Sequence, residues 1–234
     1  MSDPFVGRAG PFKTRGPFRG IRAPFRGWGR VFGRYPSRTN SIRNSAAAGA
    51  VAGTPGTAPT NWTFSALSGL TREITATGTG NGFAYVEVRL YGTAGSAFNN
   101  ASWLGFEVNN IISAASGQTW TASVFTQLIS ASMGNAGIRL RVTEFASGSS
   151  VANSTKTYTP TATMERTTLT RTLSNGTTTH VQSGIVLDAA NGAAVDFTIR
   201  IYAPQLEQGA FATAQIQTTS AAVTRKADTL VIAE

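Results

Sequence analysis

From residue 62 onward, apolar and polar residues alternate in short runs that Gly, Asn and Ser separate. The run FAYVEVRLY (83–91) places Ala84, Val86, Val88 and Leu90 on one face, and polar or aromatic residues on the other. A period of two residues is typical of a β-strand with one buried and one solvated face. The pattern recurs in the runs 119–129, 138–142, 164–173, 179–187 and 195–202. The inward residues predicted in these runs are Trp120, Ala122, Val124, Leu128, Ile138, Leu140, Val142, Val195, Phe197, Ile199 and Ile201.

The segments between these runs predict turns rather than helices. TGTGNG (77–82) has no helix after it, so it predicts a turn and not a phosphate-binding loop. SNGT (174–177) predicts a hairpin between the runs on either side of it. Because about eight to ten short strands follow one another with almost no helical periodicity, we predict an all-β, antiparallel, two-sheet sandwich resembling a jelly roll over residues 62–234.

The N-terminal region has a different pattern, which predicts an extended arm over residues 1–44. Pro-Phe pairs occur at 4–5, 11–12, 17–18 and 24–25, with Gly between them and an Arg or Lys close after each. Pro and Gly at this frequency exclude a helix and a central strand, and favour extended backbone. Residues 45–61 are rich in Ala, Gly and Pro and predict a linker between the arm and the sandwich.

The charge of the protein follows the same division. Residues 1–44 contain ten cations and one acid, Asp3, which gives 10 − 1 = +9, the net charge of the whole chain. Residues 45–234 therefore have a net charge of zero. A charge confined to one end indicates an interaction tail.

The predicted sandwich contains no recognisable catalytic or metal-binding motif. The chain has no Cys and a single histidine, His180, which excludes a thiolate nucleophile and a site with several histidines from one chain. The acids are scattered, and we expect them on solvated strand faces: Glu87, Glu107, Glu144, Glu165, Asp188 and Asp196. We therefore expect a protein that is not an enzyme and binds no cofactor.

The sequence also bears on whether the protein has a membrane or a glycan partner. No apolar run approaches the roughly 20 residues of a membrane span, and the N-terminus lacks the apolar core of a secretory signal, so we expect no membrane partner and assembly in a cytoplasm. Trp103 and Trp120 are the candidate stacking platforms for a sugar. Trp120 falls on the apolar face of its run, so we expect it in the core and not in a sugar site. A host-surface glycan is therefore a candidate ligand for which we assign no binding residues.

Two interpretations of the arm compete. In one, its cations neutralise phosphates and its rings stack on unpaired bases of a nucleic acid. In the other, it docks along grooves of partner proteins, where rings fill pockets and guanidiniums pair with carboxylates. The regular spacing of single cations and single rings favours docking, because genome-binding tails are typically dense blocks of cations. The predicted anchoring residues are Phe5, Phe12, Arg15, Phe18, Arg19, Arg22, Phe25, Arg26, Trp28, Arg30, Phe32, Arg34 and Tyr35.

The C-terminal stretch APQLEQGAFATAQIQTTSAAVTRKAD (203–228) resembles the closing motif of many tailed-phage and prophage fibre proteins. The positions that carry the resemblance are Pro204, Gln205, Leu206, Glu207, Gly209, Phe211, Thr224, Arg225 and Asp228. GTPGTAPTNW (53–62) and SGQTWTASVF (116–125) resemble the opening and middle segments of the same module. Residues 50–234 are thus similar to the phage head-spike fibre domain.

This resemblance implies a homotrimeric β-sandwich displayed on a virion for host-surface attachment. Residues 1–44 would then dock onto head, portal, collar or tail proteins of the phage. The alternative is a jelly-roll capsid protein of a small virus, whose Arg-rich arm binds the genome. Salt separates the two, because binding to phosphates weakens steeply between low and moderate salt whereas groove docking weakens modestly.

Overall fold

The computed structural model describes residues 37–130 and 132–227. The thirteen predicted anchoring residues all lie within 1–36, outside the described residues, so their role stays a prediction. In the described ranges every regular element is a strand, and no helix there is long and apolar enough to cross a membrane.

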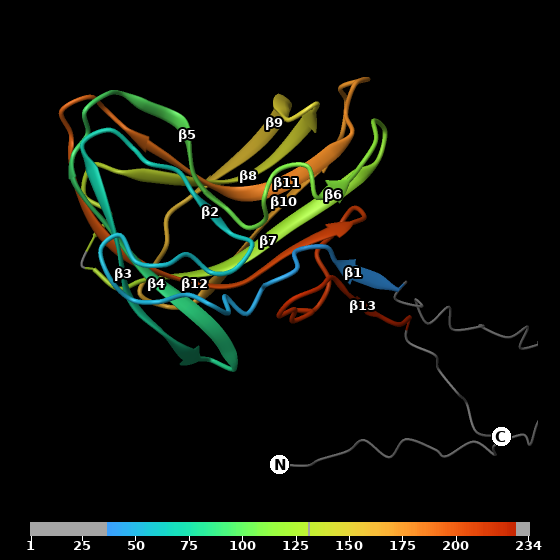
Figure 1. Cartoon of the computed structure of the whole chain (residues 1–234), viewed down its shortest axis with the longest axis horizontal. Helices are drawn as coiled ribbons and strands as arrows, with labels where there is room; N and C mark the ends of the chain where they lie inside the picture. Colours follow the sequence, from blue (N-terminus) through green and yellow to red (C-terminus); the bar gives the residue numbers. More distant parts are fainter. Residues whose placement is uncertain (1–36, 131, 228–234) are drawn as a thin grey trace, which may run out of the picture. The chain divides into compact units, whose positions relative to one another are not determined.

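Within the described residues, thirteen strands form two large antiparallel sheets and one small sheet (Figure 1). The strands are β1 (Arg38–Asn40), β2 (Thr63–Phe64), β3 (Leu70–Gly80), β4 (Phe83–Thr93), β5 (Phe98–Gly105), β6 (Ile112–Ser113), β7 (Thr119–Leu128), β8 (Gly137–Ala146), β9 (Ser149–Tyr158), β10 (Glu165–Thr172), β11 (His180–Ala189), β12 (Ala194–Gln208) and β13 (Val223–Arg225). The five-stranded sheet has the order β10-β7-β12-β4-β3, and the six-stranded sheet has the order β2-β5-β11-β8-β9, with β6 also paired to β11. β1 and β13 form the small sheet.

The chain crosses repeatedly from one large sheet to the other. After the β3–β4 hairpin, β5 and β6 lie in the six-stranded sheet, β7 in the five-stranded sheet, and β8 and β9 in the six-stranded sheet again. β10, β11 and β12 then alternate between the two sheets. This alternation produces the jelly-roll type of sandwich, so the predicted fold class is confirmed.

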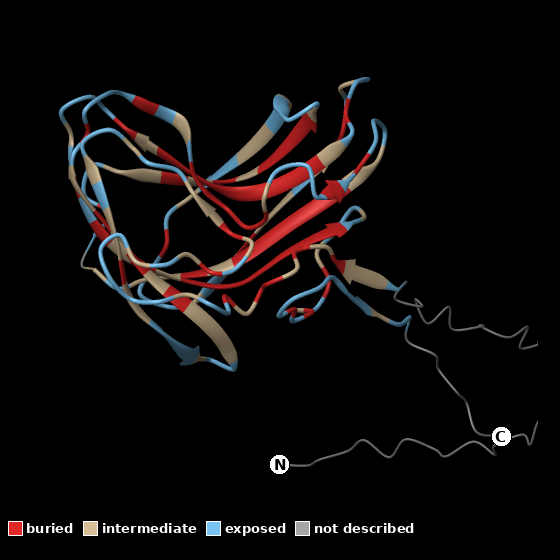
Figure 2. Ribbon diagram, viewed as in Figure 1, coloured by how far each residue is buried: buried red, intermediate tan, exposed pale blue. Residues whose placement is uncertain are grey.

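The core fills the space between the two sheets, as the red strand faces in Figure 2 show. The inward residues predicted from the period-two pattern are buried at this interface, with Leu128 and Ala84 at its partly exposed margin. Burial of these apolar side chains is the main favourable contribution to folding.

One of the two predicted turns is confirmed and the other is wrong. Asn81 and Gly82 join β3 to β4 with φ values of 53° and 82°, both in the left-handed region that a two-residue hairpin requires. SNGT does not form a hairpin, because β10 pairs with β7 whereas β11 pairs with β5, β6 and β8 of the opposite sheet. The segment 174–177 therefore spans the two layers of the sandwich.

A buried carboxylate, Glu144 of β8, fixes this crossing segment. Its Oε2 accepts hydrogen bonds from Asn175 N (3.1 Å) and Thr178 Oγ1 (2.5 Å), and its Oε1 accepts from Ser174 N (3.2 Å). Arg171 of β10 donates from Nε (2.8 Å) and Nη2 to Oε1, which joins the two sheets by an ion pair. The carboxylate thus holds the connection across the sandwich, where the backbone alone would favour a local turn.

The expectation that all the acids lie on solvated faces is therefore wrong for two of them. Glu144 is fully buried and Glu107 is 1% exposed, each paired with an arginine because a buried charge requires a partner. Glu165 and Asp196 are exposed, and Glu87 and Asp188 are half-buried.

The folded body also begins earlier than residue 62. β1 starts at Arg38, and Ile42, Asn44 and Ser45 are buried. In the expected linker 45–61, Val51 bridges Thr57, and Gly53 bridges Ile74 of β3. The composition of residues 45–61 predicted a linker. The same small, uncharged residues allow this segment to pack against the sandwich.

We predict that Glu144→Gln lowers the free energy of unfolding by about 3 kcal/mol near neutral pH, because the side chain of Arg171 loses its buried counter-charge. Burial raises the pKa of Glu144, but hydrogen bonds from Thr178, Arg171 and the backbone outweigh it and hold the pKa below 4.5. A depressed folded-state pKa gives stability that is complete above the unfolded value and is lost as the pH falls below it. Urea unfolding of both proteins should therefore show a difference that is constant above about pH 6 and shrinks below about pH 4.5. A difference independent of pH would contradict this assignment.

Candidate functional site

The two ends of the described chain meet in the small sheet. β1 pairs with β13 so that Arg38 lies opposite Arg225, and the hydroxyls of Thr39 and Thr224 are 2.7 Å apart. The N-terminal and C-terminal segments therefore attach at the same end of the sandwich (Figure 1). We call residues 38–46, 204–218 and 223–225 the terminal junction.

The side-chain amide of Asn40 is the centre of the terminal junction. Its Nδ2 donates to the carbonyls of Pro204 (3.2 Å) and Ile216 (2.9 Å). Its Oδ1 accepts from the amides of Ile42 (3.2 Å) and Leu206 (3.1 Å). Asn40 is fully buried, and its four bonds use the whole capacity of the amide. One side chain thus joins the root of the arm to β12 and to the loop that follows it.

Further buried polar groups extend this connection. Ser45 and Thr218 bond reciprocally, Ser45 N to Thr218 Oγ1 and Thr218 N to Ser45 Oγ, each at 2.8 Å. Glu107, two residues after β5, accepts from Arg43 Nε (3.0 Å) and Nη2 (2.7 Å). The N-terminal segment is therefore bonded to the segments that follow β12 of the five-stranded sheet and β5 of the six-stranded sheet.

The residues that resemble the phage-fibre closing motif build the C-terminal half of this junction. Gln205 Oε1 accepts from Ile216 N (2.7 Å), and Glu207 accepts from Thr213 N (2.9 Å) and Thr213 Oγ1 (2.6 Å). Gly209 has a φ of 144°, and a Cβ there would lie 2.4–2.6 Å from the guanidinium of Arg38. Thr224 and Arg225 lie in β13, and Asp228 is outside the described residues. The motif therefore has a structural role, since it closes the sandwich over the root of the arm.

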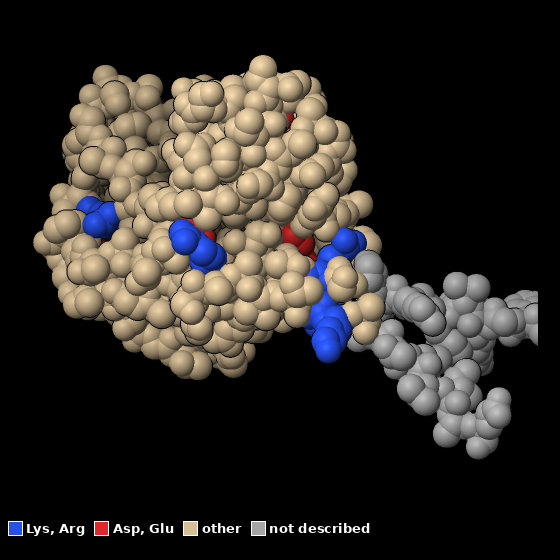
Figure 3. Space-filling model, turned by 45° about the vertical axis from the view of Figure 1, so that its right-hand side comes forward, with Lys and Arg blue, Asp and Glu red and all other residues tan. Residues whose placement is uncertain are grey.

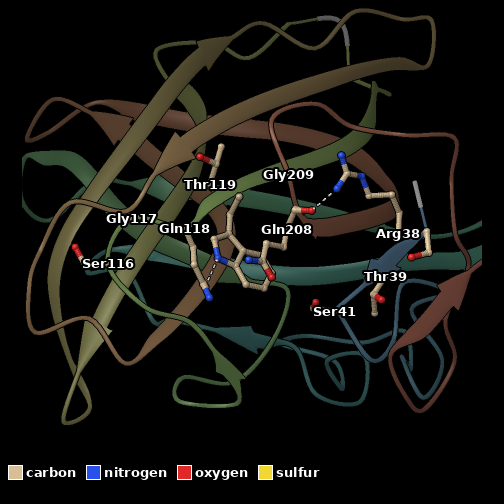
Figure 4. A pocket seen from close by; sticks show the side chains of 11 residues that line it. Arg38, Thr39, Ser41, Ser116, Gly117, Gln118, Thr119, Gln208 and Gly209 are labelled. Carbon is tan, nitrogen blue, oxygen red and sulfur yellow. Dashed lines mark hydrogen bonds between the residues drawn. The ribbon is translucent and has the colours of Figure 1, made fainter. Parts of the chain in front are cut away.

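An open groove of about 880 Å³ lies beside the junction (Figure 4). The start of β1, the segment Ser116–Trp120 and the end of β12 form it. Arg38 Nη1 donates to Gln208 O at 2.8 Å, and its guanidinium lies 5.0 Å from the ring centre of Phe211. Trp120 Nε1 donates to Gln118 Oε1 at 3.1 Å. The lining is mostly polar, with hydroxyl, amide and guanidinium groups.

Positive charge gathers at this end of the described body, where Figure 3 shows a group of blue side chains on the right. The pairing of β1 with β13 brings together Arg38, Arg225 and Lys226, and no carboxylate of the described residues forms an ion pair with any of them. Residues 1–37 contain eight cations and Asp3, giving 8 − 1 = +7. The cationic character of the arm therefore continues onto the folded body.

The other candidate residues lie apart from this site or within the core. Trp103 is 1% exposed and packs against Phe197, and Trp120 is 4% exposed, so neither ring is an open stacking platform. His180 begins β11 and its Nδ1 contacts Thr179 Oγ1. Among the residues that the structure describes, no group of His, Asp and Glu could hold a metal ion. The expectation that the protein is not an enzyme stays a prediction.

The central residues of the terminal junction carry no local signal in the sequence. Asn40 and Ser45 lie in segments interpreted as arm and linker, about 165–176 positions from their partners, and nothing local marks them. The only available signal was the closing motif, whose Gln205 and Glu207 interrupt an otherwise apolar strand end.

The geometry defines an antiparallel β-sandwich with a terminal junction at one end. No protein-family model and no curated protein sequence matches the chain. Among solved structures, it is similar to the CBM22-1 xylan-binding domain of Paenibacillus barcinonensis Xyn10C, with 13% identity, coverage of 74% of this chain and 94% of that one, and a TM-score of 0.40. The cyclase Fisc from Fischerella sp. TAU shows 12% identity over 74% of this chain and 98% of that one, with a TM-score of 0.39. Tailspike protein 4 of bacteriophage CBA120 shows 9% identity. The match covers 64% of this chain and 20% of the tailspike chain, with a TM-score of 0.33. We draw no conclusion about ligand, activity or partner from these similarities.

We predict that Asn40→Ala lowers the free energy of unfolding by about 3 kcal/mol or more, because four buried backbone groups lose their partner. Urea unfolding followed by tryptophan fluorescence measures the change. Asn99→Ala, at an exposed position, is the matched control and should change stability by less than about 0.5 kcal/mol. Equal effects of the two substitutions would contradict the central role of Asn40.

Proposed function

We propose that this chain is a structural protein of a tailed-phage virion, a head-spike or fibre component that docks through its N-terminal arm. The β-sandwich is then displayed for attachment to the host surface. The observation that carries the proposal is the terminal junction, which fixes the root of a cationic, ring-bearing arm firmly to an otherwise almost neutral body. Residues 38–234 have twelve cations and ten acids, 12 − 10 = +2, against +7 in residues 1–37.

The junction suits a protein that is held by one end. Force applied through the arm enters at β1 and passes through Asn40 and the Ser41 N–Leu206 O bond (2.9 Å) to β12. β12 is the central strand of the five-stranded sheet, with β7 and β4 bonded along its two sides. Pulling on the arm therefore loads the interior of the sandwich and not a peripheral strand that would separate easily.

The arm supplies the chemistry of docking. Its rings bury apolar surface in pockets of a partner, and its guanidiniums form charge-assisted hydrogen bonds with carboxylates. Pro at regular intervals restricts the free chain and so lowers the entropy lost on binding. Arg38 and Arg225 at the root extend the cationic surface, so the partner is expected to be acidic close to the attachment point.

The resemblance of the closing motif to phage fibre proteins supports the virion assignment and the homotrimer. The motif residues Gln205, Glu207 and Gly209 fold the C-terminal segment back over the arm root, which couples closure of the sandwich to attachment of the arm. Display of the body on a virion, after assembly in the host cytoplasm, requires no catalysis by the chain.

Arm substitutions test the proposal. We predict that replacing Phe12, Phe18 and Phe25 together by Ala reduces the copies of this protein per purified virion by about tenfold or more, because the rings are the anchors. Quantitative immunoblotting of gradient-purified particles gives the copy number. The matched control replaces three exposed apolar residues of the body, Val51, Ile111 and Ile129, by Ala and should leave the copy number unchanged.

Two outcomes would reject the proposal. If the ring variant is incorporated normally whereas Arg15, Arg19 and Arg22→Gln abolishes genome packaging, the arm binds nucleic acid and the chain is a capsid protein. Gold label on a C-terminal tag gives an independent answer. Discrete points on the head, neck or tail support a fibre, and an even distribution over an untailed shell contradicts it.

A further inference from the structure

A cavity of about 600 Å³ lies on the six-stranded sheet. β2, β5, β8, β9 and β11 contribute to its lining, together with short connecting segments. Hydroxyl and amide groups make up most of the lining, from Thr63, Ser65, Ser102, Ser150, Asn109 and Gln182. Its volume is that of a pocket for a small organic ligand and far exceeds the space that a single water or inorganic ion requires.

Two glycines let the lining residues approach one another closely. The register places Thr63 opposite Gly105, Gly105 opposite Gly184, and Gly184 opposite Arg141, so four residues form one row across four strands. Thr63 and Arg141 line the cavity from the two ends of this row. A Cβ at Gly105 would lie 2.5 Å from Thr63 Oγ1 and 2.7 Å from Gln182 Nε2, so the glycine allows both of these lining side chains to pack over it.

Arg141 is the charged group of the cavity. Its Nη2 donates to Ser102 Oγ at 2.9 Å, and its Nη1 makes a long contact of 3.4 Å with Asn100 O. None of the residues lining the cavity is an acid, and Arg141 forms no ion pair with a carboxylate of the described residues. Burial lowers the pKa of Arg141, and no counter-charge opposes that effect.

The neighbouring arginine on the same strand shows the contrast. Arg139, two residues earlier in β8, has its Nε 2.5 Å from Asp188 Oδ2 of the adjacent strand. The sheet thus supplies a carboxylate to Arg139, but only a hydroxyl and a distant backbone carbonyl to Arg141. A half-buried guanidinium facing uncharged hydrogen-bonding groups has unused capacity for an anion.

We propose that this cavity binds an acidic sugar residue of a glycan, with the carboxylate on Arg141 and the ring hydroxyls on the Ser, Thr, Asn and Gln side chains. The inference rests on the proposed display of the body for host attachment and names the class of ligand. A single guanidinium balances the one charge of a carboxylate, whereas a phosphate monoester brings about −1.5 to −2. Phe145, which also lines the cavity, gives the sugar an apolar contact.

Titration calorimetry of the purified full-length protein tests the site. The probe is a trisaccharide of glucuronic acid, compared with its methyl ester, which keeps the hydroxyls and removes the charge. We expect the acid to bind about tenfold or more tightly than the ester, because a charge-assisted bond to Arg141 is lost. Equal binding of acid and ester, no binding of either, or tighter binding of a sulfated neutral trisaccharide would overturn the proposal.

Variants assign the binding to the cavity. Arg141→Gln should weaken binding of the acid by about tenfold or more, and Ser102→Ala, which keeps the charge but removes its hydroxyl partner, should weaken it less. Arg72→Gln is the matched control, since Arg72 is a half-buried arginine of the five-stranded sheet that also forms no ion pair with a described carboxylate, and it should bind normally. Normal binding by both cavity variants would overturn the assignment.

Incorporation of Arg141→Gln into virions, measured as for the arm variants, separates this inference from the proposed function. Normal incorporation with lost glycan binding supports both. If the wild-type protein is incorporated normally but does not bind the acid in the titration, the sugar site alone is rejected. If the wild-type protein binds the acid and the variant with Phe12, Phe18 and Phe25 replaced by Ala is still incorporated normally, the anchoring role of the arm alone is rejected.

Discussion

The structure depends on the burial of one amide, the side chain of Asn40. Its four hydrogen bonds connect a segment near the N-terminus to β12 and to the loop after it, across more than 160 positions of sequence. Because all four bonds are buried, loss of the side chain removes the partner of four backbone groups inside the protein. β1, the first strand of the described chain, is therefore held to β12 and to the loop that follows it.

The buried acids serve the same purpose at other points of the sandwich. Glu107 holds Arg43 of the N-terminal segment, Glu144 holds the segment that crosses between β10 and β11, and Glu207 holds Thr213 of the C-terminal loop. Each carboxylate satisfies backbone or side-chain donors of a segment that forms few ladder bonds of its own. Charge is thus used to fix connections, whereas the strands are fixed by the apolar core.

The terminal junction and the cavity around Arg141 are centred on different sheets. The junction is centred on β12 of the five-stranded sheet, and the cavity is formed by strands of the six-stranded sheet. Glu107 connects the two, because its carboxylate accepts from Arg43 of the junction and its carbonyl accepts from Gln182 of the cavity. Both sites contain arginines without a described carboxylate partner, but Arg38 continues the charge of the arm whereas Arg141 lies alone among hydroxyls and amides.

The sandwich, its inward faces and the division of charge could be predicted from the sequence, because strand periodicity and composition are local properties. Val86, Val88, Ile138 and Leu140 are buried as the alternation predicts. The start of the folded body, the burial of two acids and the position of the cavity could not be predicted in this way. Asn40 acquires its role from partners in β12, SNGT crosses the sandwich because Glu144 holds it, and Thr63 and Arg141 line one cavity because the register sets them in one row with Gly105 and Gly184. Each of these features depends on contacts between residues far apart in the chain, and such contacts leave no periodic signal in the sequence.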